Sequence, residues 1–366
     1  MTVVGIAFLG SLGNEVLDRV VIQWLINLIL VVGLYVFIGN SGVFSFGQIS
    51  FMAVGAYTAG LLTLSESAGV FITEWPGFLA GTRLPSVPAT VVAGLAAAGV
   101  AAIIGVPLMR LSGMAASLAS FAWLIIVNVV ASNWDPVTGG LTGMAGVPIT
   151  TNRDRVIIWA VLAIIAAAVF QQSKIGLRLR ASREDEVAAQ SIGVRVHRER
   201  WVAFVLSAFF MGVGGALFGQ FVGSFNPDAF FLRITFLTIA MLVIGGLTSL
   251  SGAVLGTIVI SVVTEFLRRV EVHEVGLGPL DTLARPGLQQ VGLAVLMVGI
   301  LLSRPRGLTN GKEIGLYVHA HGKGLDRSFI AFGGRSSRGN TRSAKDAGAL
   351  PPDTTGERSG PAKEDD

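Results

Sequence analysis

Cysteine is absent from this chain of 366 residues, and charged side chains are scarce, at 14% of the sequence. Without cysteine the chain can form neither a disulfide framework nor a thiolate metal site. A soluble protein of this length needs more charge than this to cover its surface, whereas 52% of these residues are hydrophobic. The composition therefore predicts an all-α, polytopic transmembrane helical bundle.

Motifs that bind nucleotides or carry out catalysis are also missing. The sequence lacks the G-x-x-x-x-G-K-[ST] motif of a P-loop, and it lacks the H-E-x-x-H and G-x-S-x-G motifs of hydrolases. No Asp, Glu or His lies in the middle of a predicted span, where a proton-driven transporter normally carries one. We therefore expect no enzyme activity, no cofactor and no metal site in this chain, and an energy source outside it.

Apolar stretches of bilayer-crossing length recur through most of the chain. We divide it into an N-terminal segment (residues 1–19), a transmembrane domain (20–303) and a tail (304–366) that is rich in glycine, serine and charge and is expected to be mostly disordered. The N-terminus has no signal-peptide pattern, so we expect it to be retained. The nine predicted spans are Val20–Gly39, Val43–Leu64, Pro88–Met109, Gly113–Ala131, Val156–Gln171, Trp201–Val222, Ile234–Leu250, Gly252–Leu267 and Leu288–Leu302.

One polar stretch, residues 173–200, interrupts these spans and is called the charged segment below. Because so polar a stretch cannot lie in hydrocarbon, we expect it to be an aqueous loop. Ser182 stands three residues before Asp185, which predicts that its hydroxyl caps a helix beginning near Arg183. Gly193 is placed to end that helix, about ten residues long, in the left-handed conformation.

The same helix is expected to present a small, shallow face formed by Val187, Ala188 and Ser191, which fall at three- and four-residue spacing. Such a face suits a partner protein. The alternative is a surface loop whose charges only keep it hydrated.

Basic residues predict the orientation in the membrane. Of the 27 Lys and Arg residues, seven lie in the charged segment and eleven lie from Arg304 to the end. By the positive-inside rule both regions face the cytoplasm. Four predicted spans separate them, an even number, so both can lie on one side, and the N-terminus is then outside.

Small polar side chains within the spans are the candidates for a solute pathway. Glycine-interrupted spans often line a substrate cavity with exposed backbone groups. The alternative is that these residues only satisfy hydrogen bonds between helices. The candidate pathway residues are Ser45, Gln48, Ser50 and Tyr57 in the second span and Asn128 in the fourth.

Several patches, taken in order, resemble the LivM-type permeases of branched-chain amino-acid ABC importers. The resemblance covers about residues 20–310. The patches are SFGQISFMAVGAYTAGLL (Ser45–Leu62), RLRASREDEVAAQSIGVRV (Arg178–Val196), FNPDAF (Phe225–Phe230) with VIGGLTSLSGAVLG (Val243–Gly256), and SRPRGL (Ser303–Leu308).

The resemblance implies that the charged segment is a cytoplasmic coupling loop. Glu186, Ala188, Ala189 and Gly193 match the positions of the family's loop that dock on a separate ATPase subunit. ATP and Mg would be bound by that subunit, and this chain would hold no cofactor. The other implied partners are a second related permease, an external substrate-binding protein, the amino-acid substrate and the lipid bilayer, with no nucleic acid.

The expected function is translocation of branched-chain amino acids across the bacterial inner membrane. Urea, short-chain amides or other amino acids are alternative substrates within the same family. A passive channel or facilitator is the alternative of another class, and it would have no need of a capped cytoplasmic helix. A membrane enzyme is disfavoured because no catalytic cluster is present.

Overall fold

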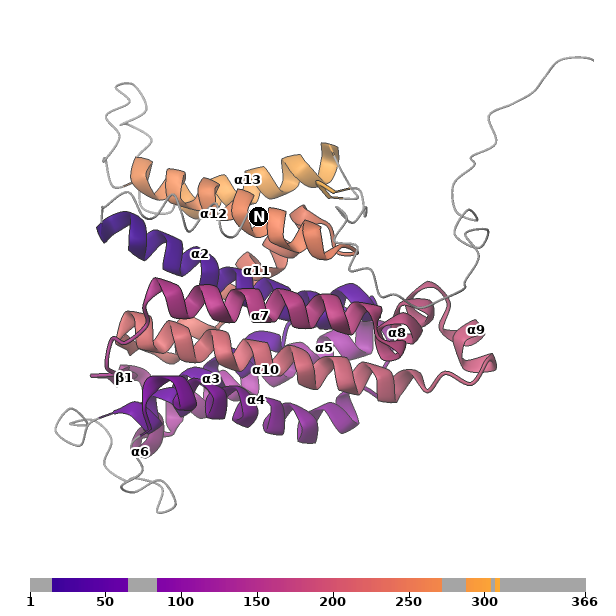
Figure 1. Ribbon diagram of the computed structural model, residues 1–366, viewed down its shortest axis with the longest axis horizontal. Helices are drawn as coiled ribbons and strands as arrows, with labels where there is room; N and C mark the ends of the chain where they lie inside the picture. Colours follow the sequence, from indigo (N-terminus) through magenta and orange to yellow (C-terminus); the bar gives the residue numbers. More distant parts are fainter. Residues whose placement is uncertain (1–14, 65–83, 272–287, 304–306, 310–366) are drawn as a thin grey trace, which may run out of the picture. The chain divides into compact units, whose positions relative to one another are not determined.

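The computed structural model describes residues 15–64, 84–271, 288–303 and 307–309, which are almost entirely helical (Figure 1). The expectations for residues 1–14 and for the tail beyond residue 309 lie outside these ranges. The elements are α2 (Glu15–Leu34), the π-helix η1 (Tyr35–Gly39), α3 (Gln48–Thr63), α4 (Ser86–Leu108), α5 (Gly113–Asn133), α6 (Asp135–Thr138), η2 (Gly140–Thr142), β1 (Met144–Ala145), α7 (Arg153–Gln172), α8 (Lys174–Glu184), α9 (Glu186–Ser191), α10 (Val196–Val222), β2 (Ser224–Phe225), η3 (Pro227–Phe230), α11 (Leu232–Gly245), α12 (Leu250–Glu271) and α13 (Leu288–Ser303).

Within the described ranges, seven helices are long and apolar enough to cross a membrane. Each of the nine predicted spans coincides with a helix. Helix α11 has 14 residues and reaches crossing length only together with η3, as Pro227–Gly245, whereas α3 and α13 have 16 residues each. A full crossing takes about 20 residues, so these two fall short of it. The chain is a multi-pass helical bundle, and within the described residues seven of the nine predicted spans have crossing length.

Helix α10 lies at the centre of the bundle, where it packs most extensively on α3 and α4 and also contacts α2. Glycine makes the close approach to α3 possible. A methyl group on Gly55 would collide with the carbonyl group of Gly212, and one on Gly215 would collide with that of Met52. These glycines therefore have a packing role, because small residues let helix backbones touch.

The next pair of helices, α11 and α12, is joined in the same way. A methyl group on Gly245 would meet the Gly252 carbonyl, and one on Gly256 would meet the Met241 carbonyl. The close contact between α11 and α12 therefore explains why glycine occupies these positions.

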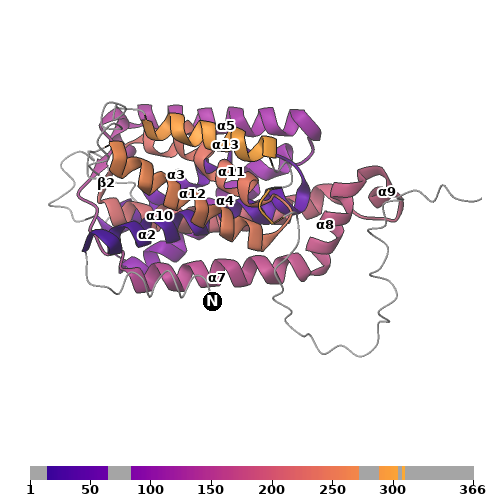
Figure 2. The same cartoon turned by 90° about the horizontal axis from the view of Figure 1, so that it is seen from above.

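The two ends of the bundle carry different structures. At one end the short strands β1 and β2 pair antiparallel, with Met144 opposite Phe225. At the other end, α8 and α9 lie beyond the ends of α7 and α10, which they connect (Figures 1 and 2). The charged segment is therefore a separate helical projection from one end of the bundle.

Candidate functional site

The charged segment folds as two short helices rather than one. Helix α8 begins after Ser173, whose Oγ accepts a hydrogen bond from the Gly176 N–H at 3.1 Å. Helix α9 begins after Asp185, whose carboxylate accepts from the Ala188 N–H at 2.9 Å. The break between the helices falls at Asp185, in extended backbone. Each helix therefore has an N-cap of its own, which satisfies one otherwise unpaired amide.

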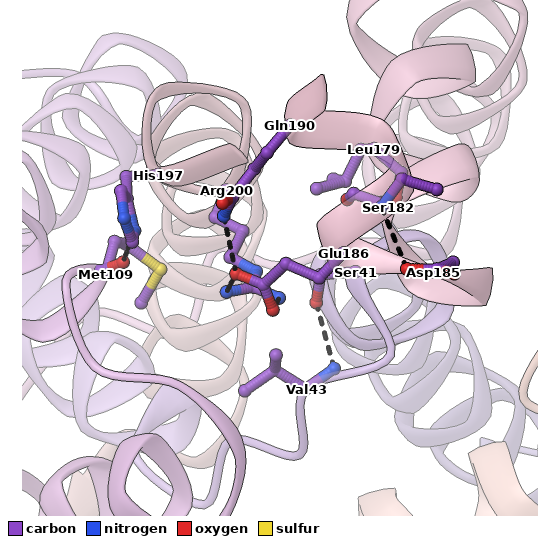
Figure 3. Close-up of polar contacts among 11 residues, drawn as sticks. Ser41, Val43, Met109, Leu179, Ser182, Asp185, Glu186, Gln190, His197 and Arg200 are labelled. Carbon is purple, nitrogen blue, oxygen red and sulfur yellow. Dashed lines mark hydrogen bonds and ion pairs between the residues drawn. The ribbon is translucent and has the colours of Figure 1, made fainter. Parts of the chain in front are cut away.

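The prediction that Ser182 caps the helix was wrong. Ser182 is buried inside α8, and its hydroxyl donates to the Leu179 carbonyl at 2.8 Å (Figure 3). A serine within an existing helix commonly bonds back to the preceding turn in this way. Because α8 already extends through Ser182, the first free position for a cap is Asp185, and α9 is six residues long instead of about ten.

The predicted role of Gly193 in ending the helix is confirmed. Its φ is 86°, in the left-handed region. Its N–H donates to the Gln190 carbonyl at 2.9 Å, and the Val194 N–H donates to the Ala189 carbonyl at 3.1 Å. This pair of bonds is the Schellman motif. A methyl group at Gly193 would meet no atom within 4 Å, so glycine is needed there for its backbone conformation and not for space.

Aliphatic side chains are exposed on α9 and at its C-terminal end. Val187 and Ile192 are each 77% exposed, and Ala188 and Ser191 beside them are also exposed. The predicted face of Val187, Ala188 and Ser191 is therefore present on the surface, now with Ile192 added. Val187 on α9 and Ile192 at its C-cap together form an exposed aliphatic surface suited to a protein partner.

Two of the four predicted coupling residues face the other way. Ala189 is 3% exposed and turned toward the rest of the chain. Glu186 forms a two-pronged ion pair with Arg200, with Nη1–Oε1 at 3.2 Å and Nη2–Oε2 at 2.9 Å (Figure 3). Ala188 and Gly193 are on the surface. Within the described chain, Glu186 thus bonds to the base of α10 and does not stand free on the outer face.

The Glu186–Arg200 pair connects α9 to the central helix. The Arg200 side chain, in the first turns of α10, is only 5% exposed, and that of Glu186 is 31% exposed. A guanidinium that is bonded at two points fixes both distance and orientation. The pair therefore fixes the position of α9 relative to the first turns of α10.

Further contacts attach the charged segment to three other helix ends. Arg183 donates to the Gly39 carbonyl at the end of η1 at 2.7 Å, and Arg180 donates to the Gln171 carbonyl in the last turn of α7 at 2.9 Å. His197 Nδ1, when protonated, donates to the Met109 carbonyl after α4 at 2.9 Å. The segment is therefore held at the ends of several spans at once.

Sequence reasoning missed the arginines of this network. It used the basic residues of the charged segment only to orient the chain in the membrane. The available signal was their number, since seven cations in one short segment exceed what topology requires. Their partners are carbonyl groups and carboxylates from distant helix ends, which the sequence pattern does not reveal.

The five predicted pathway residues lie in two separate regions. Ser45, Gln48 and Ser50 are buried around the start of α3, where the Ser50 hydroxyl donates to the Gly47 carbonyl at 2.5 Å. The side-chain amide of Gln48 is wholly buried, and neither its Nε2 nor its Oε1 has a hydrogen-bond partner within the described residues.

Tyr57 and Asn128 lie near the opposite end of α3, beside η3 and β2. Tyr57 packs edge-on against Phe225 and Phe230, with ring centroids 5.2 and 6.1 Å away. Asn128 donates to the Pro227 carbonyl at 3.3 Å. Asn128 therefore forms a hydrogen bond between α5 and η3.

Comparisons with known proteins point to one family. The family model described as "Branched-chain amino acid transport system / permease component" matches residues 16–301. The chain is 28% identical over 318 residues to the high-affinity branched-chain amino acid transport system permease protein LivM of Escherichia coli strain K12, covering 78% of this chain and 68% of the relative. No solved structure matches the chain significantly.

Two further relatives match shorter regions. The permease protein LivH of Salmonella typhimurium is 36% identical over 110 residues, covering 29% of this chain and 35% of the relative. The nucleoside ABC transporter permease protein NupC of Lactococcus lactis is 28% identical over 206 residues, covering 52% of this chain and 63% of the relative. The similarity thus extends to permeases whose names give different substrates.

Proposed function

Since the chain belongs to the family of branched-chain amino acid transport permeases, we propose that it is a membrane permease subunit of an ABC importer for branched-chain amino acids in the bacterial inner membrane. In this proposal the charged segment faces the cytoplasm and docks on an ATPase subunit. A second permease and an external binding protein complete the importer.

The observation that carries the proposal is the structure of the charged segment. It combines an exposed apolar surface at Val187 and Ile192 with bonds that attach it to four helix ends. A passive channel would gain nothing from such a projection. A chain without a P-loop motif needs a projecting segment of this kind if the energy of ATP hydrolysis comes from another subunit.

The substrate follows from the relatives and requires its own test. LivM and LivH are named for branched-chain amino acids, whereas NupC is named for nucleosides. LivM matches over 318 residues, against 206 for NupC and 110 for LivH, so branched-chain amino acids are the first expectation.

The experiment is uptake by proteoliposomes that contain the importer purified through this chain. With ATP and a binding protein supplied, L-leucine, L-isoleucine and L-valine should accumulate, and inosine, urea and acetamide should not. Accumulation without ATP at the full rate would contradict the proposal and would support a passive facilitator. Accumulation of inosine alone would transfer the substrate assignment to nucleosides.

A further inference from the structure

A cavity of about 830 Å³ lies among α2, the end of α10, η3, α11 and α12. This volume is within the usual range of small-molecule sites, about 300–1,000 Å³. Phe218 and Phe221, in the last turns of α10, form part of its wall. Because α10 begins next to α9, the cavity lies at the end of the bundle opposite the charged segment. It contains none of the predicted pathway residues.

Three helices line this cavity with the same gradient of polarity. Each contributes one arginine near the helix end: Arg19 from α2, Arg233 from α11 and Arg268 from α12. Each also contributes an uncharged residue seven or eight positions deeper: Asn27, Met241 and Ser261. At a rise of about 1.5 Å per residue, the cavity reaches roughly 10–12 Å inward from its charged rim. We call it the arginine-rimmed cavity.

Some of the charged side chains at the rim already form ion pairs within the chain, and others do not. The Glu265 carboxylate is already paired, because Arg268 forms an ion pair with it at 2.8 Å and Arg269 forms one at 2.9 Å. The side chains of Arg19, Arg233 and Asp228 have no hydrogen-bond or ion-pair partner among the residues that the structure describes. Free guanidinium and carboxylate groups therefore stand together at one opening.

The deeper wall carries a second indication of a ligand. Ser261 is 2% exposed, and its hydroxyl has no hydrogen-bond partner among the described residues. A buried polar group without a partner is costly, so it is normally satisfied by water or by a ligand. Around it the wall is largely apolar, with Trp24, Leu237 and Met241 among its residues.

We propose that the arginine-rimmed cavity binds a free α-amino acid as its zwitterion. The guanidinium groups of Arg19 and Arg233 hold the carboxylate, the Asp228 carboxylate holds the ammonium group, and the apolar wall receives the side chain. Guanidinium groups match carboxylates in geometry as well as charge. A nucleoside carries neither charge and would leave the rim groups unused. The inference rests on the proposed transport of amino acids and assigns the transported molecule a site within this chain.

Trp24 provides a direct probe of binding that does not depend on transport. The full chain in lipid nanodiscs is titrated with L-leucine while tryptophan emission is recorded. We expect a saturable change that disappears in Trp24→Phe and persists in Trp134→Phe, because Trp134 is 52% exposed and lies outside the cavity. Arg233→Gln and Asp228→Asn should each raise the half-saturating concentration about tenfold or more, whereas Arg110→Gln, exposed and outside the cavity, should not change it.

Ligand analogues test which charges are recognised. 4-Methylpentanoate lacks the ammonium group and 3-methylbutylamine lacks the carboxylate, so each should bind at least tenfold more weakly than L-leucine. Equal binding of either analogue, or of inosine, would overturn the zwitterion site.

The same variants in the uptake assay separate this inference from the proposed function. If the wild-type importer accumulates L-leucine, but the Trp24 signal is absent and Arg233→Gln transports with unchanged KM, the cavity assignment is wrong and the proposed function stands. If the importer moves no amino acid although L-leucine gives the Trp24 signal, the site is supported and the proposed function fails.

Discussion

Glu186 and Arg200 lie fourteen residues apart in the chain, on opposite sides of the break between α9 and α10, and meet as an ion pair with the arginine buried. The pairing could not be predicted from the sequence, because it depends on how the chain turns after Gly193. The family resemblance pointed to Glu186 but suggested a contact with another subunit. Its carboxylate is instead bonded within the chain.

Removing this carboxylate should uncouple α9 from α10. Glu186→Gln leaves the buried Arg200 guanidinium without its counter-charge. Since Glu186 is partly exposed, we expect the free energy of unfolding to fall by about 1–3 kcal/mol. ATP-driven L-leucine uptake should fall several-fold while the amount of inserted protein stays unchanged. Glu184→Gln is the matched control, because the Glu184 side chain is 75% exposed and pairs with the adjacent Arg183. Equal uptake by the two variants would remove the pair from the transmission path.

Gln48 remains a candidate for the solute pathway. Its amide is fully buried and unpartnered in the described part of the chain, a condition that a passing solute or a bound water would relieve. Gln48→Ala should change the KM for uptake or the order of preference among L-leucine, L-isoleucine and L-valine. Thr58→Ala serves as the control, since Thr58 is not a pathway candidate and its hydroxyl bonds to the Val54 carbonyl of the same helix. Identical kinetics for Gln48→Ala and the wild type would exclude Gln48 from the pathway.

At the scale of elements, the long helices could be predicted because an apolar run of sufficient length has few other stable forms in a membrane. The charged segment was harder. Its C-terminal signal, Gly193, is local and was predicted correctly, whereas its N-terminal cap was predicted at Ser182 and lies at Asp185. The position of this cap depends on α8, which begins at Lys174 and already includes Ser182.

The end of α9 can be tested by a single methyl group. Gly193→Ala forces an L-residue into the left-handed region, which costs about 1–2 kcal/mol. We expect weaker co-purification with the ATPase subunit and normal membrane insertion. Gly99→Ala is the control, because Gly99 is helical and also has open space around it, so alanine there should be neutral or slightly stabilising. Gly193→Asn should recover part of the loss, since asparagine tolerates this conformation; the same loss with asparagine as with alanine would contradict the explanation.

At the scale of the whole molecule, the arginine-rimmed cavity could not be predicted from the sequence, because its walls come from α2 and from α10 to α12, which are distant in the chain. Its arginines were visible only as isolated charges near span ends. Charge placement did predict an orientation, with the charged segment inside. In that predicted orientation, the cavity opens at the outer face.

The absence of cysteine makes this orientation easy to measure. Single cysteines at Ile192 and Leu141, which are 77% and 74% exposed, mark the two ends of the bundle. In intact cells a membrane-impermeant maleimide should label Leu141→Cys, and it should label Ile192→Cys only after the membrane is permeabilised. Labelling of Ile192→Cys in intact cells would place the charged segment outside.

The central claim is that a separate ATPase drives this chain through the exposed surface of α9. The most direct measurement is the amount of ATPase subunit that co-purifies with the chain when Val187 and Ile192 are both changed to Asp, compared with Leu141→Asp at the other end. The account predicts loss of the ATPase and of ATP-driven uptake in the double variant and retention of both in the control. Full retention of the ATPase and of uptake by the double variant would contradict it.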